Sequence, residues 1–541
     1  MFLKVTRAKK YTYLQLVHSY REGKKVKHRV IANLGSFETL KDNPQLLSIA
    51  RRLLELAEAS TLLPSEIEEK ERVIYGHIVY RRLWRQMKIE EELSKLVRGR
   101  RIGFNFVESV YLMVIGRLLS PGSKLQTWEN QHRYACLPVE IGLNHIYRSL
   151  DLLAEGKEEL ERSFFERGRN LFNTRVDVVF YDVTTFHFES TRARGLRRFG
   201  YSKAGKSGEV QVVLGLLIDE EGVPIGFDLF PGNTYEGRTM LRVLDKLKRR
   251  FALRRVIIVS DKAMHTKENL WHIHQGGYGY IVSMSIRKGT KKLQEEVLSE
   301  EGYEEVESER GRIRYKVLRD YPQELKDESG VVHRIKTTVV LTWTEERAEG
   351  ERAARERLLE KAREVREGVS VRDRRGYRRY LKTRGDAVVV GIDEEQYLAD
   401  GKWDGYYAIQ TNSRELTPWE IVSAYHQLWR LEESFRVMKS TMQSRPIFHW
   451  TDKRIEGHFV LCFIGFLLER RLELRLREKG IELSPERIKG VLNSLQLSRI
   501  RIKDRDYYLK GRTAQMAGKV LRALRIAPPR NVTPVEEFRI E

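Results

Sequence analysis

Three acidic residues lie in contexts that suit metal-dependent chemistry. Asp182 falls within a β-rich and nearly continuous apolar run from Val176 to Phe188. Asp261 ends a second apolar run, and Glu432 lies in a segment with the pattern of a long helix. Clustered carboxylates can hold two divalent cations about 3.5–4 Å apart, which is the arrangement used for phosphodiester cleavage. A single Asp at a strand end is more often a loop cap, so the hypothesis needs all three acids at one place.

The elements around these acids predict an α/β core. The expected order is strands at 176–188, 209–219 and 223–230, a helix at 239–251, a strand at 254–261, a helix at 267–274 and a strand at 278–286. In an RNase H-like sheet of this order the first and fourth strands are neighbours, so Asp182 and Asp261 would meet at one edge. A helix from Thr417 to Met442 would bring in Glu432, and its start is signalled by Thr417, Pro418 and Glu420 as N-cap, first and third helical residues.

The charge balance indicates a polyanionic partner. Lys and Arg number 99 against 76 Asp and Glu, a formal net charge of +23, and in the cytoplasm such a partner is usually nucleic acid. A merely basic enzyme is the alternative. The excess is concentrated at 1–30, in the loop after Asp182 and at 371–385.

The basic N-terminal segment predicts a β-hairpin. Residues 11–20 and 26–34 alternate in the strand manner around a turn at Glu22-Gly23. Its tyrosines either pack on nucleic acid or form the hairpin's own small core. The lysines expected to contact DNA are Lys9, Lys10, Lys24, Lys25 and Lys27 here, and Lys203 and Lys206 in the loop after Asp182, where a solvated loop is the alternative.

Several classes are excluded by composition. Two cysteines, Cys136 and Cys462, do not support a disulfide scaffold or a cysteine-rich zinc module. The longest apolar run, Phe459 to Leu468, is shorter than the roughly 20 residues of a membrane-spanning helix. The N-terminus lacks the apolar region of a signal peptide, so we expect a cytoplasmic, nucleoid-associated protein.

The chain is too long for one core, and changes in its pattern predict six segments. These are a basic β-hairpin (1–60), a helical DNA-binding domain (61–173), the first part of the core (174–287), a β-rich insertion (288–410), the second part of the core (411–500) and a C-terminal tail (501–541). A helix start is expected at Ser65-Glu66-Ile67-Glu68.

The segment from Tyr425 to Lys439 resembles the YREK helix of insertion-sequence DDE transposases. In that pattern a Tyr is followed by Arg, Glu and Lys at fixed spacing, and here Tyr425, Glu432 and Lys439 match while Leu428 stands at the Arg position. Arg430 or Arg436 would then supply the missing charge. On a continuous helix a spacing of seven residues is two turns, so the three matching residues would share a face.

The contexts of the other two acids also resemble this family. Tyr181-Asp182-Val183-Thr184-Thr185 is similar to the segment of the first Asp, and Val259-Ser260-Asp261-Lys262-Ala263-Met264 to that of the second. The distance from Asp261 to Glu432, 432 − 261 = 171 residues, fits the subgroup whose RNase H-like core carries a mostly β insertion before the catalytic Glu.

The resemblance implies transposition of an insertion sequence by cut and paste, a form of DNA recombination. Asp182, Asp261 and Glu432 would hold two Mg²⁺, for which Mn²⁺ can substitute. The chain would bind double-stranded DNA at inverted-repeat ends and at the target, act as a homodimer, and work in a prokaryotic cytoplasm. Trp429 or Trp403 would stack on a flipped base, with ordinary core packing as the alternative for each.

Three other functions stay open. A metal-dependent endonuclease or resolvase on the same fold would cut DNA without joining it. A catalytically inactive DNA-binding derivative would lack a working acid, although all three acids are present. A glycosidase with a carboxylate pair would account for two of the acids but not for the net charge of +23.

Overall fold

The structure is a computed structural model of all 541 residues. It describes the chain except for residues 1, 9–10, 24, 41–42, 44–47, 49–51, 53–66, 138–139, 173–177, 201–208, 241, 243–245, 247–248, 252–256, 261–265, 309–310, 366, 371–375, 386, 503–504 and 540–541. The chain divides into two compact units. The first comprises 1–72, 498–510 and 530–538, and the second comprises 73–497, 511–529 and 539–541.

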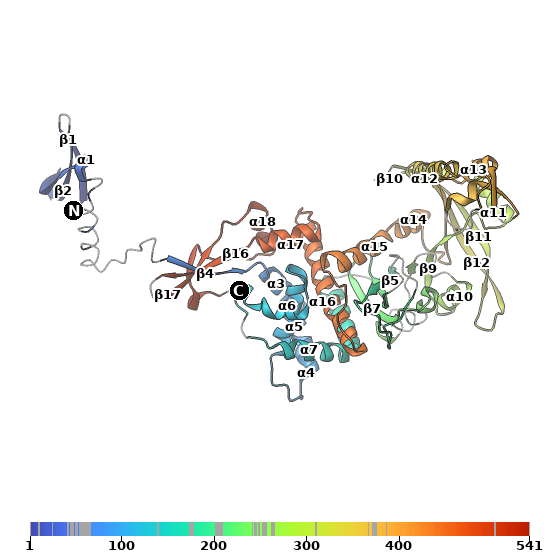
Figure 1. The fold of residues 1–541 in the computed structure, drawn as a ribbon, viewed down its shortest axis with the longest axis horizontal. Coiled ribbons are helices and arrows are strands. Elements are labelled where there is room, and N and C mark those ends of the chain that lie inside the picture. The colour runs from blue at the N-terminus through green and yellow to red at the C-terminus, as the bar shows by residue number, and fades with distance from the viewer. Residues whose placement is uncertain are drawn as a thin grey trace. The chain divides into compact units, whose positions relative to one another are not determined.

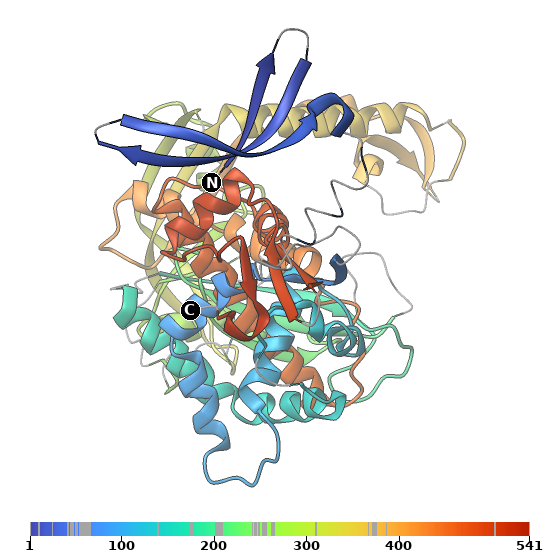
Figure 2. The ribbon, with the colours of Figure 1, turned by 90° about the vertical axis from the view of Figure 1, so that its left-hand side faces the viewer.

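The first unit opens with a three-stranded antiparallel sheet, shown in dark blue in Figure 2. Its strands are β1 (Phe2–Ala8), β2 (Tyr11–Glu22) and β3 (Lys25–Ser36), in that spatial order. The predicted hairpin is confirmed, and β1 adds a strand that the sequence reading did not include. Leu14 and Val17 are buried, whereas Tyr11 and Tyr20 are exposed. The core alternative is therefore wrong for Tyr11 and Tyr20, whereas Tyr13 is partly buried.

A second sheet has the order β18-β17-β16-β4. Its strands are β4 (Ile67–Ile74), β16 (Gln496–Ile502), β17 (Arg505–Lys510) and β18 (Val532–Pro534). The helix start expected at Ser65–Glu68 is wrong, because Ile67 and Glu68 belong to β4. Charged side chains on this strand find partners in the neighbouring strand, since Arg499 Nη1 donates to Glu71 Oε1 at 3.0 Å and Ser498 Oγ to Glu69 Oε1 at 2.9 Å.

The second unit begins with helices gathered around one long buried helix, α16 (Asp452–Arg477). Figure 1 shows α5 (Phe106–Leu119) and α7 (Leu143–Glu155) beside it, and both pack on it. The other helices of this group are α3 (Ile78–Gln86), α4 (Ile89–Val97), α6 (Lys124–Glu129), α8 (Lys157–Phe172), α17 (Pro485–Asn493) and α18 (Gln515–Ala523). The helical character expected of 61–173 is confirmed from Ile78 to Phe172. Among the described residues, no helix is long and apolar enough to cross a membrane.

The core is a mixed sheet with the expected topology. Strands β5 (Val178–His187), β6 (Gln211–Ile218) and β7 (Pro224–Pro231) form an antiparallel meander, and β8 (Ile257–Ser260) and β9 (Gly279–Met284) lie parallel to β5 on its other side. The spatial order β7-β6-β5-β8-β9 is that of an RNase H-like fold. Helix α10 (Lys267–Gln275) connects β8 to β9. The helix expected at 239–251 falls partly outside the described residues, so it stays a prediction.

The insertion continues this sheet. Strand β15 (Tyr406–Thr411) pairs with β9, and β12 (Val332–Thr344), β11 (Gly311–Lys326) and β10 (Glu304–Ser308) extend it to nine strands. Helix α11 (Lys291–Leu298) packs its buried Leu293 and Val297 in the cluster that also contains Val339 and Leu341 of β12. The β-rich character of the insertion is thus confirmed. Its main strands and the core strands form one continuous sheet.

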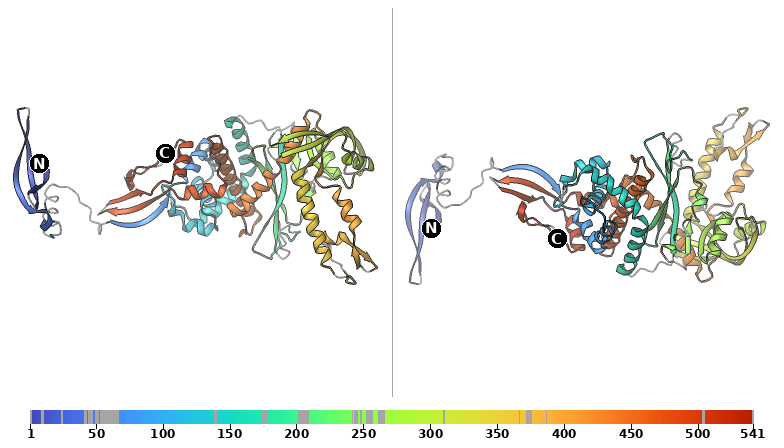
Figure 3. Two further views of the ribbon diagram at one scale, coloured as in Figure 1. Left: turned by 90° about the horizontal axis from the view of Figure 1, so that it is seen from above. Right: turned by 90° about the horizontal axis from the view of Figure 1, so that it is seen from below.

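An outer part of the insertion has a small core of its own. Helix α12 (Glu345–Arg363), visible in Figure 3 as the long golden helix, leads to the two-stranded sheet of β13 (Leu381–Arg384) and β14 (Val388–Ile392) and to α13 (Glu394–Gly401). Leu359 and Ala362 of α12 pack there with Tyr380, Leu381 and Val389.

The helix predicted from Thr417 to Met442 is broken into pieces. It begins as expected, because Thr417 and Glu420 form a reciprocal capping box at the start of α14 (Pro418–His426). The next piece is α15 (Trp429–Arg436), which ends in a π-helical turn at 437–441. The prediction of one continuous helix is wrong.

Hydrogen bonds explain the break. The N–H groups of Leu428 and Arg430 donate to the carbonyls of Tyr425 and Gln427, three residues back, at 3.1 and 2.9 Å. This tighter 3₁₀-type pattern changes the angle per residue, and the π-helical turn changes it again in the opposite sense. The argument that residues seven apart share one face therefore does not apply between Tyr425 and Lys439.

A buried acid in α16 makes stability depend on pH. The Tyr80 hydroxyl donates to Glu469 Oε2 at 2.5 Å, and burial, with the nearby charge of Glu473, raises the pKa of the Glu469 carboxyl to about 8. The unfolded chain loses this proton near the ordinary pKa of Glu, so the stabilisation is present below about pH 4.3 and is lost as pH rises through the folded value.

We therefore expect Glu469→Gln to gain stability relative to wild type by up to a few kcal/mol between pH 5 and 8. The measurement is the urea midpoint of both proteins at each pH. Glu482→Gln, an exposed acid beyond the same helix, is the control. A difference between Glu469→Gln and wild type that stays constant with pH would contradict the assignment.

Candidate active site

Asp182 lies on the central strand of the core sheet. It is partly exposed between buried neighbours, and its Oδ1 accepts a hydrogen bond from the N–H of Val183 at 2.7 Å. The parallel register of β5 and β8 pairs Tyr181 with Ser260. Asp182 and Asp261 are the residues that follow this pair in the sequence. Asp261 itself lies outside the described residues.

Lys439 reaches the strand that carries Asp182. Its ammonium donates a hydrogen bond to Thr184 Oγ1 and lies 5.4 Å from the ring centroid of Phe186. Alternate residues of a strand point to the same face, so Asp182, Thr184 and Phe186 share one. Lys439 therefore lies on the face of β5 to which Asp182 belongs, although the helix before it is broken.

Glu432 and Glu433 have different surroundings on α15, the helix that packs against β5. Glu433 accepts a hydrogen bond from Arg470 Nη2 at 2.9 Å, and this buried guanidinium also donates to Glu473 at 2.6 Å. Glu432 is exposed and makes no hydrogen bond or ion pair with the part of the chain that the structure describes. Of the two adjacent acids, Glu432 is the one available to a ligand.

The two tryptophans differ in environment. Trp429 is 43% exposed beside a cavity of about 430 Å³ lined by Arg430, Glu433 and Arg470. The core-packing reading of Trp429 is therefore wrong. Trp403 is partly buried and packs against the apolar cluster of β12 and α11, which supports core packing for that residue.

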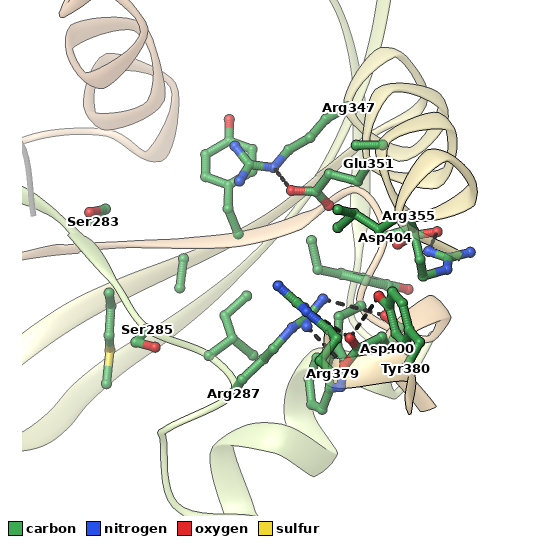
Figure 4. A pocket seen from close by; sticks show the side chains of 18 of the residues that line it. Ser283, Ser285, Arg287, Arg347, Glu351, Arg355, Arg379, Tyr380, Asp400 and Asp404 are labelled. Atoms are coloured by element: carbon green, nitrogen blue, oxygen red, sulfur yellow. Dashed lines mark hydrogen bonds and ion pairs between the residues drawn. The ribbon is translucent and has the colours of Figure 1, made fainter. Parts of the chain in front are cut away.

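Tyr425 belongs to α14 and faces the insertion. Its ring lies 6.3 Å from that of Tyr407, and both line a cavity of about 520 Å³ together with Trp403. Figure 4 shows that the arginines around this cavity meet carboxylates. Arg287 and Arg379 contact Asp400 at 3.1 and 3.0 Å, Arg347 contacts Glu351 at 3.0 Å, and Arg355 pairs with Asp404. The positive charge lining this cavity is largely neutralised from within the chain.

The remaining predicted DNA contacts are only partly described. Burial lowers the pKa of Arg430, whose guanidinium lies 5.7 Å from the Trp429 ring, whereas Arg436 is exposed at the end of α15. Lys25 and Lys27 are exposed on β3, where Lys27 pairs with Glu22. Lys9, Lys10, Lys24, Lys203 and Lys206 lie outside the described residues.

Sequence reading missed two partners at this site. Thr184 lies in the segment that resembles the family's first-Asp context, but it had no predicted role. Arg470 lies on α16, far along the chain. No local signal singles Arg470 out, because residues 466–476 also contain Glu469, Arg471, Glu473 and Arg475. Among the described residues, Glu268, His272 and Glu328 could also hold a metal ion, but they lie at α10 and the β11–β12 turn, not with the three acids.

The different surroundings of the two glutamates predict different costs of mutation. Glu433→Gln should destabilise the protein by on the order of 2 kcal/mol, because it weakens the pairing of the buried Arg470. Glu432→Gln should change stability by less than about 0.5 kcal/mol. Urea or thermal unfolding of both variants beside wild type measures this. Equal costs for the two substitutions would contradict the assignment of structural and free acids.

Comparison with known proteins relates the chain to transposases. Residues 175–468 match the model of the transposase DDE domain, and residues 3–65 match that of the N-terminal domain of IS1634 family transposases. No curated protein sequence matches the chain. Among solved structures, the chain is similar to the Mos1 transposase in its paired-end complex with the left transposon end, at 14% identity and a TM-score of 0.15. That similarity covers 34% of this chain and 60% of the Mos1 chain. Because the DDE-domain match spans more than half of the 541 residues, the chain belongs to the DDE transposase family.

Proposed function

We propose that the chain is an active transposase that cuts DNA at the ends of an insertion sequence and joins them to a target, with Asp182, Asp261 and Glu432 as its catalytic acids. The observation that carries this proposal is the contact of Lys439 with Thr184. It brings the segment that follows Glu432 onto the face of β5 that includes Asp182, while α15 packs against the same strand. The parallel register of β5 and β8 supports Asp261 as the neighbour of Asp182.

The donor atoms suit Mg²⁺, with Mn²⁺ as a substitute. Asp182 is partly exposed, and Glu432 is exposed without a partner among the described residues. Both offer carboxylate oxygens, the ligands that a hard cation prefers. When bound, two such ions would activate the attacking hydroxyl and stabilise the leaving oxygen. The Lys439 ammonium, which donates a hydrogen bond to Thr184 Oγ1, would contact the phosphate next to the scissile bond.

Other parts of the chain would hold the DNA. The N-terminal sheet exposes Lys25 and Lys27 near its β2–β3 turn, where Tyr20 pairs with Lys27, and it exposes Tyr11 at the other end of β2. Lysines suit phosphates, and exposed aromatic rings suit sugars or bases. Trp429, exposed at the start of α15, is the better candidate of the two tryptophans for stacking on an unpaired base. Pairing of two transposon ends calls for a homodimer, and this DNA substrate favours a location at the nucleoid. We also propose that the chain is a member of the YREK class, in which Leu428 would stand at the position of the Arg.

Substitution of any one acid should abolish cleavage. We expect Asp182→Asn, Asp261→Asn and Glu432→Gln each to lower the rate of end cleavage by at least about 100-fold while leaving DNA affinity unchanged. Chelation by EDTA should stop wild-type cleavage, and added Mg²⁺ or Mn²⁺ should restore it. The assay follows labelled duplexes that carry the inverted repeat flanking the gene.

Glu356→Gln, an exposed glutamate on α12, is the matched control and should cleave normally. Full cleavage by any of the three acid variants would overturn the assignment. The products separate the alternatives, because a nuclease or resolvase would release ends without strand-transfer products. An inactive derivative would bind the duplex and produce neither.

DNA affinity should also fall steeply with salt, because binding displaces counterions from phosphates. Substituting Lys25 and Lys27 together by Gln should reduce the slope of log K against log salt by about 2. The slope can be measured by fluorescence anisotropy of labelled DNA at KCl concentrations from about 50 to about 300 mM. An unchanged slope, equal to that of the exposed control Lys479→Gln, would remove the N-terminal sheet from the DNA surface.

A further inference from the structure

Another polar cavity lies among the helices of the second unit, and neither Asp182 nor Glu432 lines it. Its volume is about 160 Å³. It lies between the end of α5, the start of α6, the segment 443–449 and α16. The polar side chains that line it are Arg117, Lys124, Tyr147, Arg445, His449 and His458. Leu125 and Phe448 also line it and are exposed, so the cavity reaches the surface.

Two cations of this cavity are buried without an acid. Arg117 is 6% exposed and Lys124 is 5% exposed. Arg117 Nη1 donates to the carbonyls of Met442 and Gln443 at 3.2 and 2.9 Å, which are neutral acceptors. Within the described ranges, no carboxylate lines this cavity and the Lys124 ammonium has no hydrogen bond or ion pair. The cavity of the insertion differs in this respect, because its arginines meet Asp400, Asp404 and Glu351.

Further donors and acceptors here lack partners. Arg117 Nε and His458 Nδ1 are buried and make no hydrogen bond with the described part of the chain. The His458 ring lies 5.2 Å from that of His449, and its Nε2 contacts the Ser444 carbonyl at 3.3 Å. The Nε2 contact with a carbonyl makes Nδ1 of the neutral His458 ring an acceptor, so the unmatched donors are Arg117 Nε and the Lys124 ammonium. Buried donors are nearly always satisfied, so two unmatched cationic donors at one cavity indicate an anionic ligand.

Electrostatics agrees with this geometry. Burial, followed by the charge of Arg117, lowers the pKa of Lys124 to about 7. Burial and the charges of Lys124 and Arg117 lower the pKa of His449 to about 3, and the pKa of His458 is also well below its ordinary value. Burial is the largest cause of each of these shifts, and no carboxylate lines the cavity to offset it. An anion in the cavity would oppose these shifts.

We propose that this cavity binds a phosphate group, either a phosphodiester of bound DNA or free inorganic phosphate. A tetrahedral oxyanion accepts hydrogen bonds in several directions at once, which suits an ammonium, a guanidinium and imidazole groups arranged around one space. The volume is close to the roughly 150 Å³ cavities that hold a molecule the size of benzene, so a phosphate fits.

The position of the cavity favours DNA as the source. The segment that lines it follows Lys439 directly in the chain, and the N–H of Ile447 donates to the His187 carbonyl of β5 at 3.2 Å. His187 is five residues beyond Asp182, or roughly 17 Å along the strand. A duplex that reaches Asp182 could therefore place another of its phosphates in this cavity. The inference does not depend on the metal ligands proposed above.

The first test uses the full-length chain and inorganic phosphate. Phosphate should raise the melting temperature of wild type in a concentration-dependent way, beyond the effect of chloride at equal ionic strength. Lys124→Met should lose this shift. The variant should fold, because it replaces an unpaired buried charge by an apolar side chain of similar length. Should it fail to fold, calorimetric titration of wild type with phosphate would decide the question instead.

The second test separates the two sources. For a phosphodiester, Lys124→Met should bind a transposon-end duplex about tenfold more weakly, with a salt slope lower by about 1. For free phosphate only, the melting shift would disappear in the variant while DNA affinity stayed at the wild-type level. Lys479→Gln, an exposed lysine, is the control in both tests.

The proposal is overturned if phosphate has no specific effect on wild type and Lys124→Met binds DNA normally. Asp182→Asn should keep the phosphate shift, because its carboxylate does not line the cavity. Loss of cleavage in Asp182→Asn with the shift retained would thus support both proposals separately. Normal cleavage with the shift retained would overturn only the assignment of the catalytic acids.

Discussion

The parallel pairing of β5 with β8 is the constraint on which the proposed active site depends. Asp182 and Asp261 are 79 residues apart (261 − 182 = 79), and the register Tyr181 to Ser260 brings the residues just before them side by side. Parallel strands need a crossover between them, and the β6–β7 meander occupies the other side of β5. The two aspartates can therefore come together only after β5 and β8 have paired. The third acid, Glu432, lies on α15, which packs against β5.

Compensation of charge organises the rest of the second unit. Arg470 is buried between Glu433 and Glu473, and the arginines of the insertion cavity meet acids of the same region. Such pairs cost desolvation and contribute modest net stability, but a partner left alone is expensive. Against this background Arg117 and Lys124 stand apart, because their cavity holds no acid among its described lining residues. With a net charge of +23, the chain has more cationic side chains than its own acids can pair, so a polyanion can bind to those that remain.

The insertion is joined to the core through backbone hydrogen bonds. Strand β15 pairs with β9, so the nine strands run as one sheet from the core into the insertion. Helix α14 follows β15 directly and carries Tyr425 to the ring of Tyr407 on that strand. The chain thus returns from the insertion at a fixed place before α15 begins. This coupling gives a physical reason why such a long insertion need not displace Glu432 from the core.

The sequence by itself determined the element order of the core, the N-terminal hairpin, the cap at Thr417 and the family, because these depend on local periodicity, turn chemistry and short motifs. It could not determine the break between α14 and α15, since the switch from i−4 to i−3 hydrogen bonds has no local signal there. The motif spacing selected Glu432, but the sequence could not show that Glu433 pairs with Arg470, which lies 37 residues further along the chain. Strand β4 was misread for the same reason, because its charged residues gain their partners from β16. Only the tertiary structure decided which distant segments contact one another, because those contacts determine which charged side chains become buried and therefore need a partner.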